Sequence, residues 1–213
     1  LYVASDALLG RIADFAKAGG HVLLTLKSGF TNEWSTVRWT RAPGPLREAA
    51  GISYQEFSGL KEPLPLRGDP FRAGPENRVS VWADMVLAET AKPLAFYDHP
   101  FFGRYPALTR NAFGKGTVTY QGTVLSAALQ ERVVADVLRT AGIVPEAGLP
   151  ARVRSRQAVG RDGRALRFYL NFSGEPQALA YAHGAGTELL SQKAVAAGER
   201  LTLAPWDLAV VRE

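Results

Sequence analysis

The chain has 213 residues, of which 46% are hydrophobic and 21% charged, and its formal net charge is +5. This size and composition suffice for one or two domains. The chain has no cysteine, which excludes disulfides, thiolate metal sites and a cysteine nucleophile. It also has no apolar run of membrane-spanning length, so we expect no membrane partner.

The first residues indicate a piece of a longer protein. The single methionine is Met85, so Leu1 is not an initiator residue. Residues 1–4 have the pattern of a strand entered partway along its length. We therefore expect a longer form, which mass spectrometry of the source culture would detect.

A strand, a helix and a second strand are predicted over residues 1–26. Ser5 is a suitable N-cap for a helix with one apolar face, and Gly19 and Gly20 end that helix. The run from His21 to Leu26 is almost entirely apolar, which is typical of a strand covered on both faces in a parallel sheet. This order predicts a βαβ unit with a right-handed crossover.

A long loop is predicted from Lys27 to Pro45, where glycine, proline and two tryptophans occur without periodicity. Open parallel sheets bind ligands beyond the carboxyl ends of their strands, which is where this loop emerges. Ser28 and Thr31 are the candidate nucleophiles there. The three histidines are scattered and no Gly-x-Ser-x-Gly turn is present, so we favour a structural use of both hydroxyls over catalysis.

The middle of the chain predicts short elements. We expect a short helix over 45–50, a strand over 52–57, an irregular excursion over 60–77 and a strand over 79–87. The excursion is expected because that stretch is rich in proline and charged residues.

Residues 96–105 concentrate aromatic side chains around Asp98, His99 and Arg104. Aromatic residues and arginine are enriched at interfaces, although aromatic residues fill cores as often. Asp98 and His99 are neighbours on an extended chain, so their side chains point to opposite sides and are poorly placed as an acid/base pair. A surface histidine with satisfied hydrogen bonds is the favoured interpretation of His99.

The stretch from Tyr105 to Gly142 predicts a hairpin followed by a helix. Alternating residues flank Gly114-Lys115-Gly116, whose glycines supply the positive φ of a tight turn. Ser126 is a suitable N-cap for the helix, and Gly142 is a suitable left-handed C-cap.

Beyond a linker at 143–150, the chain predicts a small antiparallel β-sandwich. Closely spaced strands are expected at 152–158, 166–172, 177–182, 188–192, 200–203 and 206–211. Arg152, Arg154 and Arg156 alternate and therefore share one face of the first of these strands. A solvated sheet face is favoured over a nucleic-acid surface, so we expect no nucleic-acid partner.

Two stretches resemble the trimerisation domain of the family 42 glycoside hydrolases, which are β-galactosidases. The first comprises Gly19-Gly20, Ser28-Gly29, Asn32-Glu33, Pro43 to Arg47 and Gly51-Ile52. The second comprises Pro106 to Gly116, Tyr120 and Gly122-Thr123. A weaker resemblance, to the C-terminal β domain of the same family, involves Phe168 to Phe172, Leu201 to Trp206 and Val210-Val211.

This resemblance implies an α/β trimerisation domain over 1–145 and a small antiparallel β-sandwich domain over 151–213. The first would have an open sheet with flanking helices, like the flavodoxin-like and class I glutamine amidotransferase-like folds. The resemblance also implies a retaining β-galactosidase that removes terminal β-D-galactosyl residues with two glutamates of a (β/α)8 barrel. No such barrel fits within this chain, so we expect the chain alone to be inactive, with no catalytic residue, cofactor or metal of its own.

The family resemblance further implies a homotrimer and a cytoplasmic enzyme of bacterial type. Each subunit would stand near a neighbour's active-site cleft, while the galactoside itself would be bound through the missing barrel. The candidate residues for an interface or an active-site rim are Trp34, His99, Phe101, Phe102, Arg104 and Tyr105.

Two other functional classes remain open. One is an independent module that binds carbohydrate through aromatic residues such as Trp206 or Tyr181, or nucleic acid through the arginine face. An aromatic side chain that closes a core is the more common use in so small a sandwich. The other class is a stand-alone amidotransferase-like hydrolase, against which the absence of cysteine is the main objection. Binding of galactosides or nucleic acid by the isolated chain would separate a binding module from an assembly role.

Overall fold

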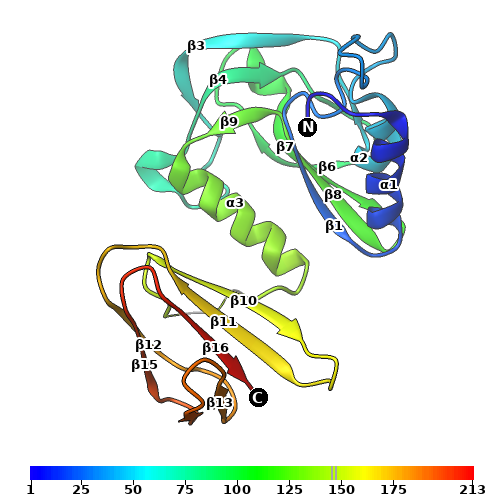
Figure 1. Ribbon diagram of the computed structural model, residues 1–213. Helices are drawn as coiled ribbons and strands as arrows, with labels where there is room; N and C mark the ends of the chain where they lie inside the picture. Colours follow the sequence, from blue (N-terminus) through cyan, green and yellow to red (C-terminus); the bar gives the residue numbers. More distant parts are fainter. Residues whose placement is uncertain (145, 147) are drawn as a thin grey trace. The chain divides into compact units, whose positions relative to one another are not determined.

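The computed structural model describes residues 1–144, 146 and 148–213 (Figure 1). The chain divides into two compact units, Leu1–Val144 and Pro145–Glu213. The first is mixed α/β and the second is β-rich. The domain boundary predicted at residue 145 falls outside the described residues. No helix among the described residues is long and apolar enough to cross a bilayer.

A four-stranded mixed sheet forms the centre of the first unit, in the order β1-β8-β7-β6. The bounds are β1 His21–Thr25, β6 Lys92–Phe96, β7 Pro106–Phe113 and β8 Gly116–Gln121. β1 pairs with β8 in parallel, whereas β8, β7 and β6 pair antiparallel. The predicted hairpin is confirmed as β7 and β8, and Gly114 in its turn has a φ of 60°.

The first strand predicted at residues 1–4 is wrong, and with it the βαβ unit. Only Val3 makes a bridge there, to Thr31 in the loop after β1. The Thr31 N–H donates to the Tyr2 carbonyl at 3.0 Å, and the Gly29 N–H donates to the Leu1 carbonyl at 2.8 Å. The backbone groups at the start of the chain are thus satisfied by the loop instead of by the sheet.

The helices α1 (Asp6–Lys17) and α3 (Ala127–Thr140) are capped as predicted. The Ser5 side chain accepts a hydrogen bond at the start of α1, and the Ser126 side chain does so at the start of α3. Gly142 follows α3 with a φ of 68°, the left-handed conformation that a C-terminal glycine adopts without steric cost. The short helix predicted over 45–50 is confirmed as η1 (Gly44–Leu46) and α2 (Arg47–Ala50).

Two hydrophobic cores hold the first unit together. In one, Leu9 of α1 belongs to the same buried cluster as Leu24 of β1 and Tyr120 of β8. In the other, Leu129 of α3 belongs to a cluster with Leu108 of β7. Burial of these side chains is the main stabilising contribution, because each fully buried Leu contributes about 1.5–3 kcal/mol.

Further strands complete the first unit: β2 Ile52–Ser53, β3 Phe57–Pro65, β4 Arg78–Asp84, β5 Leu87–Ala88 and β9 Thr123–Leu125. β3, β4 and β9 form a second sheet, and β2 pairs with β5 (Figure 1). The strand predicted over 79–87 therefore ends early, and the strand predicted over 52–57 shortens to β2. The excursion predicted from residue 60 is wrong as far as Pro65. β3 is an edge strand, and an edge tolerates proline because one side of it needs no ladder hydrogen bond.

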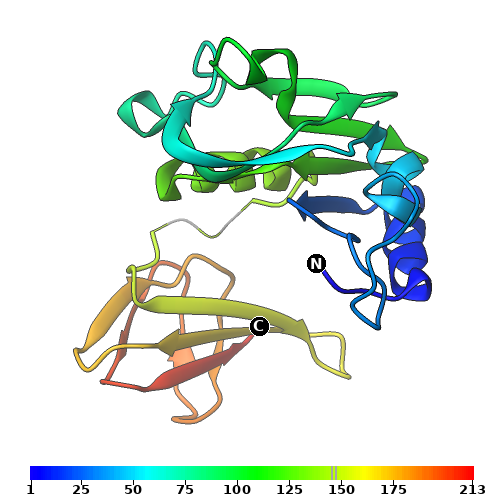
Figure 2. The same ribbon diagram turned by 90° about the horizontal axis from the view of Figure 1, so that it is seen from above.

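The second unit contains two antiparallel sheets (Figure 2). Their strands are β10 Val153–Val159, β11 Ala165–Asn171, β12 Gln177–Ala180, β13 Gly186–Glu188, β14 Ala194–Val195, β15 Arg200–Leu203 and β16 Leu208–Arg212. Tyr169, Tyr181 and Val211 lie in their shared core. The strand predicted over 188–192 is wrong, because β13 ends at Glu188 and the chain turns there. The carboxylate of Glu188 accepts hydrogen bonds from the N–H groups of that turn.

Candidate functional site

Lys27, two residues after the end of β1, has a φ of 53°. This left-handed backbone conformation favours glycine. Such a conformation costs a non-glycine residue about 1 kcal/mol or more. The candidate nucleophiles follow it. The Ser28 hydroxyl donates to the Thr25 carbonyl at 2.7 Å, and the Thr31 hydroxyl donates to the Tyr2 carbonyl at 3.4 Å. Both hydroxyls therefore donate to backbone carbonyls, which is the structural use that the sequence favours.

The Lys27 ammonium lies in a cage of aromatic rings, which we call the Lys27 cage. Its nitrogen stands 4.0 Å from the ring centroid of Trp82, 4.3 Å from that of Phe57, 5.0 Å from that of Phe30 and 5.8 Å from that of Tyr2. Each such cation–π contact contributes roughly 0.5–2 kcal/mol, depending on its burial. The rings come from the chain start, the loop after β1, β3 and β4, so the cage connects four separate segments.

A buried carboxyl group, Asp84, lies next to the cage at the end of β4. It accepts hydrogen bonds from the Trp82 indole N–H and from the Tyr120 hydroxyl, both at 2.8 Å, and from the Lys27 N–H at 3.4 Å. Burial raises the pKa of Asp84 above its ordinary value, and the hydrogen bonds from Trp82 and Tyr120 oppose that rise. Burial of the Asp84 carboxyl group therefore costs free energy, and the hydrogen bonds from Trp82 and Tyr120 offset part of that cost.

Tyr54 lies beside this network. Burial raises the pKa of Tyr54, and the charge of Asp84 raises it further, so its hydroxyl stays protonated. That hydroxyl is near Tyr120 and the Lys27 backbone, yet it makes no hydrogen bond of normal geometry with any described residue. A buried donor without a partner costs about 1–3 kcal/mol.

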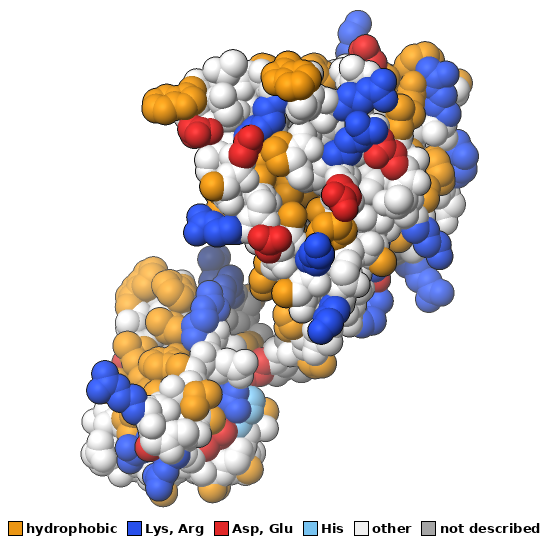
Figure 3. All heavy atoms as spheres, turned by 90° about the vertical axis from the view of Figure 1, so that its right-hand side faces the viewer, with side chains coloured by type: hydrophobic (Ala, Val, Ile, Leu, Met, Phe, Trp, Pro, Cys, Tyr) orange, Lys and Arg blue, Asp and Glu red, His pale blue; other side chains and the backbone are white. Residues whose placement is uncertain are grey.

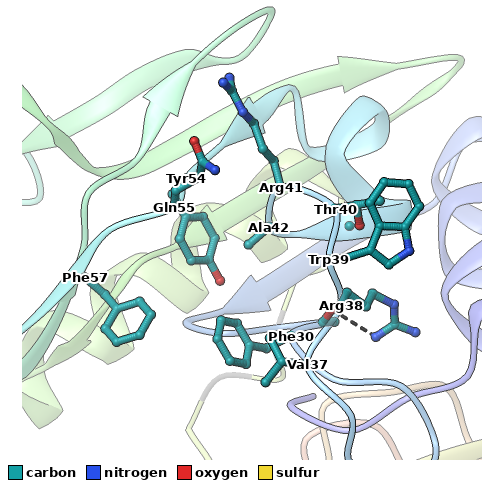
Figure 4. A pocket seen from close by; sticks show the side chains of 12 residues that line it. Phe30, Val37, Arg38, Trp39, Thr40, Arg41, Ala42, Tyr54, Gln55 and Phe57 are labelled. Carbon is teal, nitrogen blue, oxygen red and sulfur yellow. Dashed lines mark hydrogen bonds between the residues drawn. The ribbon is translucent and has the colours of Figure 1, made fainter.

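A cavity of about 200 Å³ lies under the loop that follows β1 (Figure 4). It is lined by Gly29, Phe30, Val37, Arg38, Trp39, Thr40, Arg41, Ala42, Gly44, Tyr54, Gln55 and Phe57. A second hollow, of about 160 Å³, shares Arg41, Tyr54 and Gln55 with the first and adds Tyr105. The loop and the predicted rim segment therefore contribute to neighbouring hollows.

Arg38 holds the loop over this cavity. Its guanidinium donates to the carbonyls of Ala4, Gly29 and Thr31, and it pairs with the carboxylate of Asp6. Only 10% of the Arg38 side chain is exposed. A planar guanidinium with five donors can satisfy several acceptors at once, which a lysine cannot.

The tryptophans of the loop project from it. Trp34 is 80% exposed and Trp39 is 95% exposed, although both are large apolar side chains. The Asn32 side chain accepts hydrogen bonds from the N–H groups of Trp34 and Thr36, which fixes the turn that carries Trp34. An exposed tryptophan on a fixed turn, such as Trp34, is typical of a contact surface.

The predicted residues of segment 99–105 lie together. The His99 and Phe102 rings stack at 4.6 Å, and Phe101 packs edge-on against Phe102 at 5.3 Å. The Arg104 guanidinium lies 5.1 Å from the Phe101 ring centroid and 4.8 Å from that of Tyr105. Trp34 comes from a different segment and takes no part in these contacts.

The histidine of this segment has a structural role. His99 Nδ1 accepts hydrogen bonds from the N–H groups of Phe101 and Phe102, both at 3.1 Å. These bonds fix the turn into η3 (Phe102–Arg104). The prediction of a histidine with satisfied hydrogen bonds is confirmed, and an acid/base pair with Asp98 gains no support.

A wider apolar hollow lies against α1 and β1, and Figure 3 faces that side of the first unit. Its volume is about 740 Å³, and Leu8, Ile12 and Phe15 line it. Phe15 is 60% exposed. An exposed apolar hollow of this kind typically marks a protein contact.

The two aromatic candidates of the second unit, Tyr181 and Trp206, differ in their burial. Tyr181 is buried in the core, as predicted, and its hydroxyl donates to Glu213 at 2.8 Å. The core role considered for Trp206 is wrong, because this side chain is 71% exposed in a turn where its φ is 58°.

Arg154 and Arg156 are exposed on β10 and donate to backbone carbonyls near them. Among the described residues, no group of three or more histidine or acidic side chains is placed to hold a metal ion.

Comparison with known proteins assigns both units to domains of glycoside hydrolases. Residues 1–144 match the model of the β-galactosidase trimerisation domain, and residues 152–213 match that of the β-galactosidase C-terminal domain. The chain therefore belongs to the β-galactosidases of glycoside hydrolase family 42, as a chain that contains these two domains.

Individual relatives are β-galactosidases. The chain is 31% identical over 203 residues to a β-galactosidase of Arthrobacter sp. and 27% identical over 218 residues to β-galactosidase LacA of Lactobacillus acidophilus. It spans 27% and 31% of those proteins, and the matches cover 95% and 100% of this chain. The crystal structure of the β-galactosidase from Bacillus circulans sp. alkalophilus superposes with a TM-score of 0.82 at 25% identity, covering 100% of this chain and 32% of that one.

Proposed function

We propose that this chain is the assembly region of a retaining β-galactosidase. The observation that carries the proposal is the match of residues 1–144 to a trimerisation domain, in a chain that spans about 30% of its β-galactosidase relatives. Hydrolysis of terminal β-galactosyl residues needs two carboxyl groups about 5–5.5 Å apart, which a (β/α)8 barrel of about 250 residues would supply. This chain then contributes no catalytic group and forms contacts with copies of itself.

The contact surface consists of the exposed apolar features of the first unit. Trp34 and Trp39 project from a loop that Arg38 holds, and the exposed Phe101 and the half-buried Tyr105 flank the Arg104 guanidinium. Aromatic residues and arginine supply most of the binding energy at protein interfaces. In the assembled enzyme, the loop and segment 99–105 reach the rim of a neighbouring subunit's active site.

Three further assignments accompany this proposal. The first unit is an amidotransferase-like or flavodoxin-like α/β domain, supported by the parallel pair of β1 and β8 and by the strained turn at Lys27 that follows β1. The domains extend over 1–145 and 151–213. The enzyme acts in the cytoplasm.

Light scattering of the purified chain over a range of concentrations tests the assembly role. We expect a mass of three times 23.0 kDa at micromolar concentration, because interface contacts of this kind give specific association without the barrel. A monomer at every concentration would contradict the proposal that the assembly contacts lie within this chain.

A further inference from the structure

β1 is an edge strand with the sequence of an internal strand. In the sheet order β1-β8-β7-β6 it stands at one end, and β8 is its only partner among the described strands. Its residues, His21–Thr25, include three consecutive aliphatic side chains and no lysine, arginine, acidic residue or proline. Its pairing with β8 runs without a register shift. Charges, proline and bulges normally protect an edge from further pairing, so this edge lacks the usual protection.

The backbone of β1 has unpaired hydrogen-bonding groups along this edge. The Thr117 N–H of β8 donates to the Gly20 carbonyl at 3.2 Å. Because alternate residues of a strand direct their backbone groups to opposite edges, those of Val22 face β8. The N–H and C=O groups of His21 and Leu23 therefore face the open edge, where no described strand pairs with them. A strand placed there would give each of these groups a partner.

The apolar hollow of about 740 Å³ adjoins the open edge. On the helix side it is lined by Leu8, Ile12 and Phe15, which follow one another at helical spacing on α1. The helix therefore directs an apolar stripe toward the hollow. Phe15 is 60% exposed, so this stripe is covered only in part. A hollow that is apolar on the helix side and has backbone donors and acceptors on the strand side suits an extended apolar segment.

The first residues of the chain give the direction of such a segment. The Gly29 N–H donates to the Leu1 carbonyl at 2.8 Å, which places Leu1 near the carboxyl end of β1. Val3 then forms a parallel bridge with Thr31. The hollow is lined by Leu1 and extends along β1 as far as His21, at the opposite end of that strand. A segment that fills the hollow and leads into Leu1 therefore runs parallel to β1.

We propose that the open edge of β1 and its hollow receive an extended apolar segment of polypeptide that leads into Leu1 and joins the sheet as a strand parallel to β1. Side chains of the segment would pack against the stripe of α1, and its backbone would pair with His21 and Leu23. Parallel strands that are covered on both faces are apolar along their length, which defines the chemistry of the segment. This inference does not rest on the assembly role, because it concerns the sheet of a single subunit.

The test compares the 213-residue chain with two extended forms of it. One carries about eight residues rich in valine in front of Leu1, and the other carries a glycine–serine extension of the same length. About eight residues suffice to reach His21, since a strand rises roughly 3.3 Å per residue. Amide hydrogen exchange followed by NMR should show the Leu23 amide exchanging at least tenfold more slowly with the valine extension, and unchanged with the glycine–serine extension. The Val22 amide, which faces β8, is the internal control and should be protected in all three chains.

Urea unfolding gives a second measure. The valine extension should lower the unfolding equilibrium constant at least tenfold relative to the glycine–serine extension, because it buries apolar surface in the hollow. Phe15→Ala should reduce that gain. Val134→Ala truncates a residue of α3 that is 37% exposed and does not line the hollow, so it should leave the gain unchanged.

Unchanged exchange of the Leu23 amide in the valine-extended chain, equal slowing by both extensions, or loss of the fold on adding the valine extension would each overturn the proposal. So would equal reductions of the gain in Phe15→Ala and Val134→Ala. Protection of Leu23 in the unextended chain that grows with protein concentration would assign the edge to a second copy, and would also overturn it.

The assembly role has a separate outcome in the same samples, because light scattering reports the mass of the chain. A trimer in which the valine extension leaves Leu23 exchange unchanged would overturn the strand site alone. A monomer in which that extension protects Leu23 would overturn the assembly role alone.

Discussion

Asp84 is a carboxyl group held in an aromatic interior, and its ionisation affects stability. Its pKa is raised from 3.8 in the folded chain, with burial as the main cause. The folded state therefore holds this proton more tightly than the unfolded state does. As the pH rises from 3.8 through the raised pKa, the unfolding free energy falls by this contribution, and below 3.8 the contribution is fully present.

Asp84→Asn tests this linkage. The variant has no proton to lose, so we expect its unfolding free energy, relative to that of the unaltered chain, to rise as the pH increases from 4 to 7. Urea unfolding at several pH values measures the difference. Asp98→Asn removes an exposed carboxyl group of the same unit and serves as the control. Parallel pH profiles of Asp84→Asn and the unaltered chain would contradict the account.

At the scale of elements, α1 and the β7–β8 turn approach each other through glycine. A Cβ atom on Gly116 would lie 2.0 Å from the Gly20 carbonyl oxygen and 2.4 Å from that of Ala16. Both neighbours are backbone atoms, so the structure cannot relieve the clash by turning a side chain. Gly10, within α1, has no atom within 4 Å of the place where its Cβ would stand.

Alanine substitutions at these two glycines should act in opposite directions. Gly116→Ala should destabilise the first unit by about 3 kcal/mol or more, because helix and hairpin must separate. Gly10→Ala should stabilise it by about 1 kcal/mol, because alanine is the better helix former and no atom opposes it. Urea unfolding followed by circular dichroism measures both. A neutral Gly116→Ala would mean that α1 packs elsewhere.

The sequence predicts elements well where a local signal determines them. Ser5, Ser126 and Gly142 specify helix ends through their own backbone and side-chain chemistry. Gly114 supplies the positive φ of the β7–β8 turn, whereas Gly116 does not have the positive φ predicted for it. The sequence does not predict β3 beyond residue 60, because its partner β4 lies further along the chain and proline in an edge strand gives a misleading local signal. The strand predicted over residues 1–4 is absent because an apolar start indicates a strand without showing what it pairs with.

The candidate site was only partly predictable, for the same reason. The location of the candidate site beyond the carboxyl end of β1 can be predicted from the topology of the sheet. The structural role of His99 can be predicted from its neighbours in the sequence. The Lys27 cage joins Tyr2, Phe30, Phe57 and Trp82 through tertiary contacts that no local pattern encodes. Tyr54 and Asp84 are ordinary residues in the sequence, and only burial gives them chemical interest.

At the scale of the whole molecule, assembly should depend on the aromatic surface of the first unit. Trp34→Ala and Arg104→Ala should each shift the proposed trimer toward monomer by tenfold or more in dissociation constant, which corresponds to about 1.4 kcal/mol. Light scattering with dilution measures the shift. Trp206→Ala removes another exposed tryptophan, from the second unit, and should leave the mass unchanged. Equal effects of all three variants would indicate nonspecific association.

The hydrogen bonds of the Arg38 guanidinium affect the entropy and the rate of association. The Arg38 guanidinium joins the chain start at Ala4 to Gly29 and Thr31, which precede the turn that carries Trp34, so this turn is ordered before any partner arrives. A flexible loop would lose roughly 0.5–1.5 kcal/mol for each side chain immobilised on binding. Here the backbone of the turn is already ordered in the folded chain, so binding adds only the loss for the exposed side chains. The association rate constant should therefore be that of two proteins that need no conformational change to bind. Differences in affinity should then come from the dissociation rate constant.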